Sequence, residues 1–537
     1  MTQALDYPGG WPQPADAASA EAVYAPRRPV AVCFTMFWTL LALLSWMAGG
    51  IGIVTDMAWI GMTITCIAFV IAELVRFPRR LGIGGMVIFG GLILWFGMDY
   101  FKYWSGFAEP ASLSGVGAGD LVPGDRETDF LTAKATFYTF LFFAFMHVGL
   151  LIRAGGWLPR LIASIPQPRH SGAMFGLILA LFIFGLLPYF LFTNDPWYIA
   201  IYKDVVGMRS GGAQWTVGRT GTINFDWGGY VAQWLQIGSF AGLLAAFHAI
   251  FMAADPLTRL LCWVMYAYSF AYAFGTGSRG EVVYFTAPVA AMFFIKYQVS
   301  MLGWIRRGRF RAYVIALVIV AIAYVTSQIQ GIYRMVGLEQ VELEWEQISD
   351  PRDNTMFSHS LFVFRNIPDQ HPHFFNRFPG HGAIVAIPQA VFYFTIGPIP
   401  RAIWNSKPIQ PAMEWASKER SGVVTDVTWT GISSGIAGSW YATTGVLGMI
   451  QGAILWGWLI GCFDRVLWMT RNKPLILLVG LTFHATMFRT FRDPDYNLFY
   501  PLLIGLAALW VLSRLVEKQT DRLPDPYAPT PYPQYAY

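Results

Sequence analysis

Hydrophobic residues fill this chain in long, nearly uninterrupted stretches, unlike the short periodic patterns of a soluble domain. A helix that crosses the hydrocarbon core of a bilayer needs about 20 mostly apolar residues. Stretches of that kind lie at residues 30–53, 56–75, 81–101, 131–152, 171–193, 230–252, 257–276, 281–298, 310–328, 446–467, 474–492 and 497–517. The pattern predicts an all-α integral membrane protein with about twelve transmembrane helices.

Lysine and arginine residues gather in six places at the ends of these stretches. The clusters are Arg27 and Arg28; Arg76, Arg79 and Arg80; Arg153, Arg160 and Arg169; Lys296, Arg306, Arg307, Arg309 and Arg311; Arg465, Arg471 and Lys473; and Arg514 and Lys518. When about twelve helices are counted, all six clusters fall on one side of the membrane. The positive-inside rule assigns that side to the cytoplasm, so both termini are expected there.

Residues 329–431 form the one long segment after the N-terminus that membrane-type residues do not dominate, and the topology places it outside. Its stretch 383–404 is apolar but contains Pro388, Pro398 and Pro400, and counting it as a span would invert every later loop. We therefore expect a re-entrant or interfacial segment there. The expected organisation is a disordered cytoplasmic tail (1–28), nine helices (29–328), the large outer loop (329–431), three helices (432–518) and a second cytoplasmic tail (519–537).

Composition agrees with this picture. The 537 residues are 55% hydrophobic and 13% charged, whereas soluble domains carry about 25% charged residues. The net charge of +5 is small and sits in short loops, so it indicates topology and not nucleic-acid binding. The four cysteines lie in or beside apolar stretches and lack metal-ligand spacing. Neither a P-loop nor a dinucleotide fingerprint is present, so no nucleotide-driven activity is indicated.

Cationic residues on the outer side are the best candidates for chemistry. Arg279 and Glu281 belong to the glycine-rich run 275–281, Arg489 and Arg492 precede the last helix, and the long loop carries further cations. Those of the loop that we single out are Arg401, Lys407 and Arg420. The guanidinium fork matches phosphate oxygens in pairs, so this set suits a phosphate or pyrophosphate. The alternatives are a solvated loop, a tight turn that reaches the lipid headgroups, and local ion pairs such as Arg492 with Asp493.

Aromatic and metal-binding residues add little to this site. Trp404 and Trp429 offer flat faces on which sugar rings could stack, although aromatic side chains are common at any membrane interface. His371 and His373 are too short a motif for a zinc site, and no other His, Cys or carboxylate arrangement has metal-ligand spacing. We therefore expect a site without a metal or cofactor.

The run Pro400-Arg-Ala-Ile-Trp-Asn-Ser-Lys-Pro408 resembles a signature of the O-antigen polymerases, which are bacterial oligosaccharide repeat-unit polymerases. In that signature a Pro-Arg pair, a hydrophobic residue and a tryptophan precede a Lys-Pro pair. The surrounding sequence is similar too, with the turn 276–280 and the small-residue run 438–452. The resemblance covers mainly residues 260–510, and the N-terminal half matches only as a string of membrane helices.

The resemblance implies a metal-independent glycosyltransferase of the bacterial inner membrane with a periplasmic active site. Its substrate would be an oligosaccharide on undecaprenyl pyrophosphate, and its other partners membrane lipids, a chain-length regulator and a flippase. Pyrophosphate binding would fall to Arg279, Arg401, Lys407, Arg420, Arg489 and Arg492. The sequence leaves the general base open among Glu281, His381 and Asp426, and Glu281 could simply pair with Arg279.

Two other functions remain open at the sequence level. A ligase-like transferase would use the same leaving group and deliver the glycan to a different acceptor. A transporter of lipid-linked oligosaccharide or polysaccharide would carry charged residues near the midplane of several helices. The gathering of charge at one outer face favours the enzyme.

Overall fold

The protein is seen here as a computed structural model. It describes residues 28–77, 82–98, 100–101, 126–152, 156–165, 171–191, 196–206, 228–253, 255–275, 279–296, 386–396, 399, 404, 435–470, 473–492, 499–500, 502–503, 505–507 and 510–511. Within these ranges all regular secondary structure is helical. The expectation of an all-α protein is confirmed for them.

The longer described helices coincide with the apolar stretches of the sequence. They are α2 (Arg28–Met47), α3 (Gly52–Arg76), α4 (Gly84–Gly91) with its continuation η1 (Leu92–Gly97), α6 (Arg126–Leu151), α8 (Ser171–Leu186), α11 (Gly228–Phe251), α12 (Pro256–Gly275), α13 (Arg279–Lys296), α21 (Gly435–Met469) and α22 (Pro474–Thr490). Four shorter helices are α7 (Trp157–Ala163), α9 (Pro188–Leu191), α10 (Trp197–Val206) and α19 (Ala386–Ile396).

Within the described residues, six helical segments are long and apolar enough to cross a membrane. They are Pro29–Met47, Gly52–Arg76, Arg126–Leu151, Ser171–Leu191, Trp234–Phe251 and Gly445–Met469. A multi-pass membrane protein is therefore confirmed, while the count of about twelve spans stays a prediction, since the stretch 310–328 lies outside the described residues. Helix α19 has 11 residues, about half the length that a crossing needs.

Two boundaries differ from the prediction because of glycines in the left-handed region. The first helix ends at Met47 instead of residue 53, since Gly49 and Gly50 adopt φ values of 89° and 87°. These values are accessible to glycine and strained for other residues. Helix α21 starts eleven residues before the predicted 446, and it bends at Gly445, where φ is 68°. The part of α21 before this bend falls between the predicted end of the outer loop at residue 431 and the predicted start of the span at residue 446.

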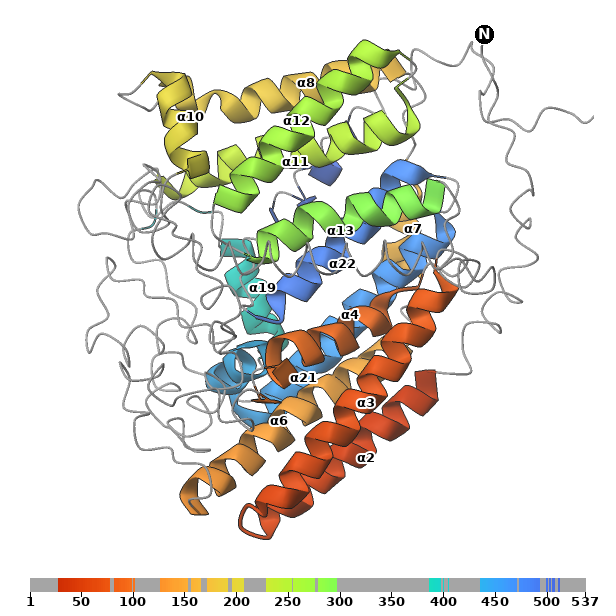
Figure 1. The fold of residues 1–537 in the computed structure, drawn as a ribbon, viewed down its shortest axis with the longest axis vertical. Helices are drawn as coiled ribbons and strands as arrows, with labels where there is room; N and C mark the ends of the chain where they lie inside the picture. The colour runs from red at the N-terminus through yellow and green to blue at the C-terminus, as the bar shows by residue number, and fades with distance from the viewer. Residues whose placement is uncertain are drawn as a thin grey trace, which may run out of the picture.

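The helices lie side by side in a layered bundle (Figure 1). Helix α6 packs against α2 and α21, α21 against α22, and α22 against α13, while α11 packs against α8 and α12. Helices α6 and α21 approach most closely through glycine: a Cβ on Gly457 would collide with the backbone of Met146, and one on Gly149 with that of Ile454. Small residues at crossings are how membrane helices gain packing without a hydrophobic drive between them.

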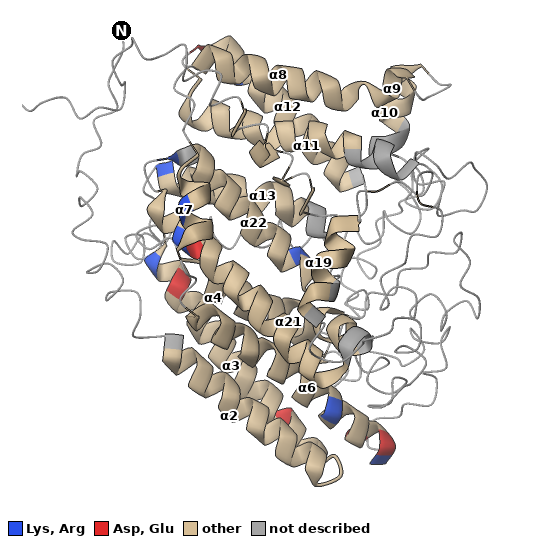
Figure 2. Ribbon diagram, turned by 180° about the vertical axis from the view of Figure 1, so that it is seen from behind, with Lys and Arg blue, Asp and Glu red and all other residues tan. Residues whose placement is uncertain are grey.

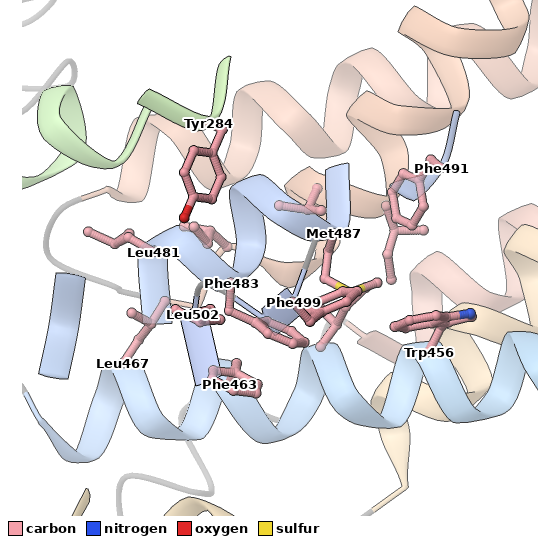
Figure 3. Packing of buried hydrophobic residues seen from close by; sticks show 14 of the residues in the cluster. Tyr284, Trp456, Phe463, Leu467, Leu481, Phe483, Met487, Phe491, Phe499 and Leu502 are labelled. Carbon is pink, nitrogen blue, oxygen red and sulfur yellow. The ribbon is translucent and has the colours of Figure 1, made fainter. Parts of the chain in front are cut away.

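Aromatic side chains fill the interface between α21 and α22. Phe463 of α21 and Phe483 of α22 stack with ring centroids 3.6 Å apart, and Phe499 packs beside Phe483 at 5.8 Å. Figure 3 shows these rings together with Trp456 and Met487. By contrast, α2, α3 and α12 turn large apolar side chains outward: Met47, Ile53 and Leu257 are 75%, 70% and 66% exposed. Apolar faces of this size suit contact with lipid.

Two hydrogen bonds join helix ends that the sequence predicts on the cytoplasmic side, and both lie at the same end of the bundle. Lys473, just before α22, donates to the carbonyl of Ala163 in α7 at 2.7 Å, and Lys296 at the end of α13 donates to the carbonyl of Ile250 at the end of α11. In Figure 2 the Lys and Arg residues of the helices cluster around α7 at this end, and beside α19 and at the tip of α6 at the other, with a mostly uncharged band between. That band is the part suited to the hydrocarbon core.

Candidate functional site

Four predicted site residues lie on described helices or at their ends. Arg279 is the first residue of α13 and Glu281 the third, and their backbone alone is described. Arg489 lies in the last turn of α22, and Arg492 follows just after that helix. Trp404 is a half-buried residue outside any helix. The remaining predicted residues lie outside the described ranges: His381, Arg401, Lys407, Arg420, Asp426 and Trp429.

The fold brings Arg279 and Arg489 to the same end of the bundle. The last residue of α13, Lys296, contacts the C-terminal end of α11, and the start of α22 contacts α7. Figure 1 shows α7 beside the ends of α13 and α22 at which these contacts occur. The first residue of α13 and the last turn of α22 therefore lie at the opposite end. Arg279 and Arg489, which are about 200 residues apart in sequence, are therefore carried by helix ends on the same side of the bundle.

Arg492 is held at this end by Trp95. The guanidinium carbon of Arg492 lies 5.9 Å from the centre of the Trp95 ring, within the range of a cation–π contact. The Trp95 indole N–H donates to the carbonyl oxygen of Phe488 at 2.9 Å. This carbonyl belongs to the last turn of α22, where helical partners run out. Trp95 thus caps α22 and supports the cation that follows it.

A broken helix lies beside the same helix end. The segment of α21 before Gly445 is joined to α22 by the Ile436 N–H, which donates to the carbonyl oxygen of Phe491 at 2.9 Å. A Cβ on Gly452 would collide with the indole of Trp440, so Trp440 folds back over the second part of α21. The small-residue run 438–452, on which the family resemblance partly rests, spans the bend at Gly445. Broken helices at membrane depth are typical of binding sites.

Helix α19 reaches this end as well. The Tyr500 hydroxyl donates to the carbonyl oxygen of Phe394 in α19 at 2.6 Å, and α19 packs against α21. The helix ends at Ile396, and the Ile399 N–H donates to its carbonyl at 2.9 Å. The signature run starts at the next residue, Pro400. The signature run therefore begins just after α19, a helix that packs against α21.

One buried cation of this half of the bundle was not anticipated. Lys134 of α6 is 8% exposed, and its ammonium lies 5.9 Å from the ring of Tyr138. Tyr138 in turn packs against Tyr441 of the broken helix, with ring centroids 5.2 Å apart. The sequence carried a signal, because an ionisable residue inside an apolar span marks a functional position by default. The length of the apolar stretch 131–152 alone does not reveal this position.

A second unanticipated feature is a buried ion pair in the other half. The Nε2 atom of His484 lies 3.1 Å from Oδ1 of Asp464, and Nδ1 lies 2.7 Å from the carbonyl oxygen of Gly480. Each ring nitrogen of His484 thus lies within hydrogen-bond distance of an acceptor oxygen. Oδ1 of Asp464 also accepts the N–H groups of Ile83 and Gly84 at 3.0 and 2.9 Å. The pair ties α21 and α22 to the start of α4.

A third polar cluster connects α8, α11 and α12 at the end where α7 lies. His248 has Nε2 3.1 Å from the Ser171 hydroxyl and Nδ1 3.5 Å from the Cys262 sulfur. The Ser171 hydroxyl also contacts the carbonyl oxygen of Met252 at 3.2 Å. His248 and Cys262 are fully buried. The cluster therefore holds the three helices together at a position that a substrate cannot reach. A nucleophile would have to be accessible.

Among the described residues, no group of three or more His, Cys, Asp or Glu side chains is placed to hold a metal ion. What the end of the bundle with Arg489 and Arg492 offers instead is arginine. Preorganised guanidinium groups stabilise negative charge that develops on oxygen. The described part of the site is thus suited to an anion.

No family model matches the chain, and neither a curated protein nor a solved structure was found that is similar to it. The function is therefore argued from the residues and their arrangement.

Proposed function

We propose that this protein is a membrane glycosyltransferase that polymerises a bacterial polysaccharide. It transfers the growing glycan from undecaprenyl pyrophosphate onto the next lipid-linked repeat unit at the periplasmic face of the inner membrane. The observation that carries the proposal is the meeting of Arg489, Arg492 and the start of α13 at one end of an apolar bundle. The signature run after α19 leaves from the same group of helices.

The positive-inside rule gives the orientation of this site. The bundle end at which α7, Lys296 and Lys473 lie is the end of the cationic loops, and we assign it to the cytoplasm. The opposite end, with Arg489 and Arg492, then faces the periplasm. Lipid-linked repeat units would approach from the bilayer, along the exposed apolar faces of the outer helices.

The reaction requires that the protein stabilise the leaving pyrophosphate and that it accept a proton from the acceptor hydroxyl. A hydroxyl oxygen of the acceptor unit bonds to the anomeric carbon of the donor glycan, and the bond from that carbon to the pyrophosphate oxygen breaks. The leaving undecaprenyl pyrophosphate keeps the electron pair, and arginines stabilise the charge on it. We assign this role to Arg279, Arg401, Arg420, Arg489 and Arg492, with Lys407 assisting.

The proton of the acceptor hydroxyl passes to a general base, which is Glu281, His381 or Asp426. Trp404 and Trp429 would offer their ring faces to the sugars. Neither a metal nor a cofactor is needed for this displacement, because the pyrophosphate is already an activated leaving group.

A second function is favoured by one specific observation, the charged pair inside the bundle. Asp464 and His484 are 2% and 1% exposed, and buried charges on several helices are typical of transporters. A lipid-linked oligosaccharide transporter therefore remains the main competing hypothesis. Both nitrogens of His484 and Oδ1 of Asp464 have hydrogen-bond partners within the protein, which suits a structural role better than a transport path.

The deciding experiment uses the purified protein in nanodiscs with an oligosaccharide on undecaprenyl pyrophosphate and no nucleotide sugar. A ladder of longer lipid-linked products would support the polymerase. If no ladder forms but the glycan crosses the membrane of a reconstituted vesicle, the protein is a transporter. A single transfer to an added lipid A core acceptor, without a ladder, would identify a ligase-like enzyme.

A further inference from the structure

Trp95 makes three contacts with the end of α22, although the two elements are about 390 residues apart in sequence. Its N–H donates to the carbonyl oxygen of Phe488, its ring lies 5.7 Å from the Phe488 ring, and the Arg492 guanidinium lies over it. The indole is 8% exposed. Because both the indole N–H and the ring of Trp95 are held, the side chain has little conformational freedom. It therefore restricts the Arg492 guanidinium that lies over it.

Trp95 lies in η1, the π-helical continuation of α4, and this backbone determines the direction of its indole. Residues Leu92–Gly97 form a π-helix, in which one extra residue per turn rotates the side chains that follow. A Cβ on Gly91 would collide with the Phe491 ring, so a larger residue there would push α22 away. Short π-helical insertions are frequent at functional sites. The glycine and the insertion together bring Trp95 under Arg492.

We propose that Trp95 is a positioning residue that orients Arg492 toward the pyrophosphate group of the undecaprenyl carrier. The inference rests on the function proposed above and assigns one side of that site. Stacking on an aromatic ring occupies the face of a guanidinium and leaves its N–H groups directed outward in the plane. These in-plane N–H groups are the ones that bind two phosphate oxygens at once.

Held in this way, Arg492 would favour a pyrophosphate over a monophosphate. A pyrophosphate spreads its charge over two phosphorus centres, and a fixed guanidinium can bridge oxygens that a mobile side chain would meet only occasionally. The ordering of the side chain takes place on folding and not on binding, which increases affinity. Trp95 would thus act on the carrier through Arg492 without touching it.

The test measures the affinity of undecaprenyl pyrophosphate and of undecaprenyl phosphate for the full-length protein in nanodiscs. The variants are Trp95→Leu, Trp95→Phe, Arg492→Ala and the double variant Trp95→Leu with Arg492→Ala. Trp46→Leu is the matched control, because Trp46 is a packed tryptophan in the same half of the bundle whose ring contacts are Phe130, Phe137 and Tyr138. Thermal unfolding of every variant reports whether the fold is kept.

We expect Trp95→Leu to weaken pyrophosphate binding by roughly 3- to 30-fold, the range of a cation–π contact, with a smaller effect on the monophosphate. Trp95→Phe keeps a ring and should lose less. In the Arg492→Ala background the Trp95 substitution should have no further effect, since its target is gone. Trp46→Leu should bind like the wild type.

Other outcomes overturn the inference in distinguishable ways. If the wild-type protein does not bind undecaprenyl pyrophosphate, both the proposed function and the role of Trp95 fail. If it binds and the two substitutions act additively, or Trp95→Leu has no effect, only the role of Trp95 fails. Should Trp95→Leu not fold, the same comparisons are made with Trp95→Phe, whose smaller loss must likewise vanish without Arg492.

Discussion

Asp464 and His484 form an ion pair between α21 and α22, with Oδ1 and Nε2 3.1 Å apart and both side chains almost completely buried. The carboxylate also receives two N–H groups at the start of α4. The consecutive helices α21 and α22 and the start of α4, which lies 381 residues earlier, therefore meet at one oxygen atom. A charge in this position is tolerated only because every partner is present.

Removing one member of the pair should destabilise the fold strongly. Asp464→Ala leaves the buried Nε2 of His484 without its partner and two backbone N–H groups without an acceptor. Loss of one partner of a buried pair costs about 3–5 kcal/mol, so we expect a clearly lower midpoint of thermal unfolding in detergent.

The control for this prediction is the double variant Asp464→Asn with His484→Gln, which replaces the charges by amides of similar shape. It should unfold at a higher temperature than Asp464→Ala, because the buried N–H groups keep an acceptor oxygen. Equal midpoints for the wild type and Asp464→Ala would show that the pair does not hold the helices together.

The crossing of α6 and α21 depends on a glycine. A Cβ on Gly457 would meet the backbone of Met146, which cannot move aside as a flexible side chain can. Gly457→Val should therefore separate the helices and cost about 1–3 kcal/mol, the usual range for overpacking. Gly176→Ala in α8 is the matched control: nothing lies within 4 Å of the added Cβ, so the substitution should be neutral or slightly stabilising. If both variants unfold like the wild type, the close approach of the two helices is not needed.

The helices themselves could be predicted from the sequence because the length of an apolar run is a local property. Helix α13 spans 279–296 where 281–298 was expected, and α22 spans 474–490 where 474–492 was expected. The turn at Gly49 could not be placed, since the apolar pattern runs through it without interruption. The bend at Gly445 depends on how α21 packs around it, which composition does not report.

The site was predictable only where one residue carries its own signal. Arg489 and Arg492 stand out as cations at a helix end, and the fold brings them to the same end as the start of α13. Lys134 carries the signal of an ionisable residue inside an apolar span, whereas Trp95 gives no comparable signal, because its importance comes from partners in a distant helix. The candidates of the long outer loop, such as Arg401, lie outside the described residues and stay predictions.

Asp255 begins α12 and should make the stability of that helix depend on acid pH. Its Oδ1 accepts the Thr258 N–H at 2.7 Å, and this bond, with that of the Thr258 hydroxyl, lowers the pKa of the Asp255 carboxyl. A lowered pKa in the folded state means that the carboxylate stabilises the fold above its unfolded pKa of about 3.9. The contribution is lost as the pH falls through the folded pKa.

We therefore expect Asp255→Ala to lower the unfolding midpoint at pH 7 and to approach the wild type as the pH falls below about 4. Asp255→Asn keeps a capping oxygen without a charge, so its midpoint should lie between the two and should not follow this titration. A difference between wild type and Asp255→Ala that stays constant down to pH 3 would exclude the carboxylate as its source.

The orientation of the bundle can be tested with single cysteines. In a chain whose four natural cysteines are replaced by serine, Ser164→Cys lies at the exposed end of α7 and Ser421→Cys in the long polar segment. If the cationic loops are cytoplasmic, a membrane-impermeant maleimide should label residue 421 in spheroplasts and residue 164 only after the membrane is opened. The reverse labelling would place the arginine-rich end in the cytoplasm and remove the periplasmic site.

Arg401 lies in the signature run and should be required for the reaction but not for the fold. Loss of one preorganised group that stabilises the leaving charge lowers a rate by about 100- to 1,000-fold, so Arg401→Ala should yield almost no polymer ladder from the lipid-linked substrate at unchanged abundance in the membrane. Arg160→Ala is the matched control, since Arg160 is an exposed arginine of α7 at the other end of the bundle. It should give the wild-type ladder. A normal ladder from Arg401→Ala would remove Arg401 from the site, and an equal loss from both variants would point to a general effect of removing positive charge.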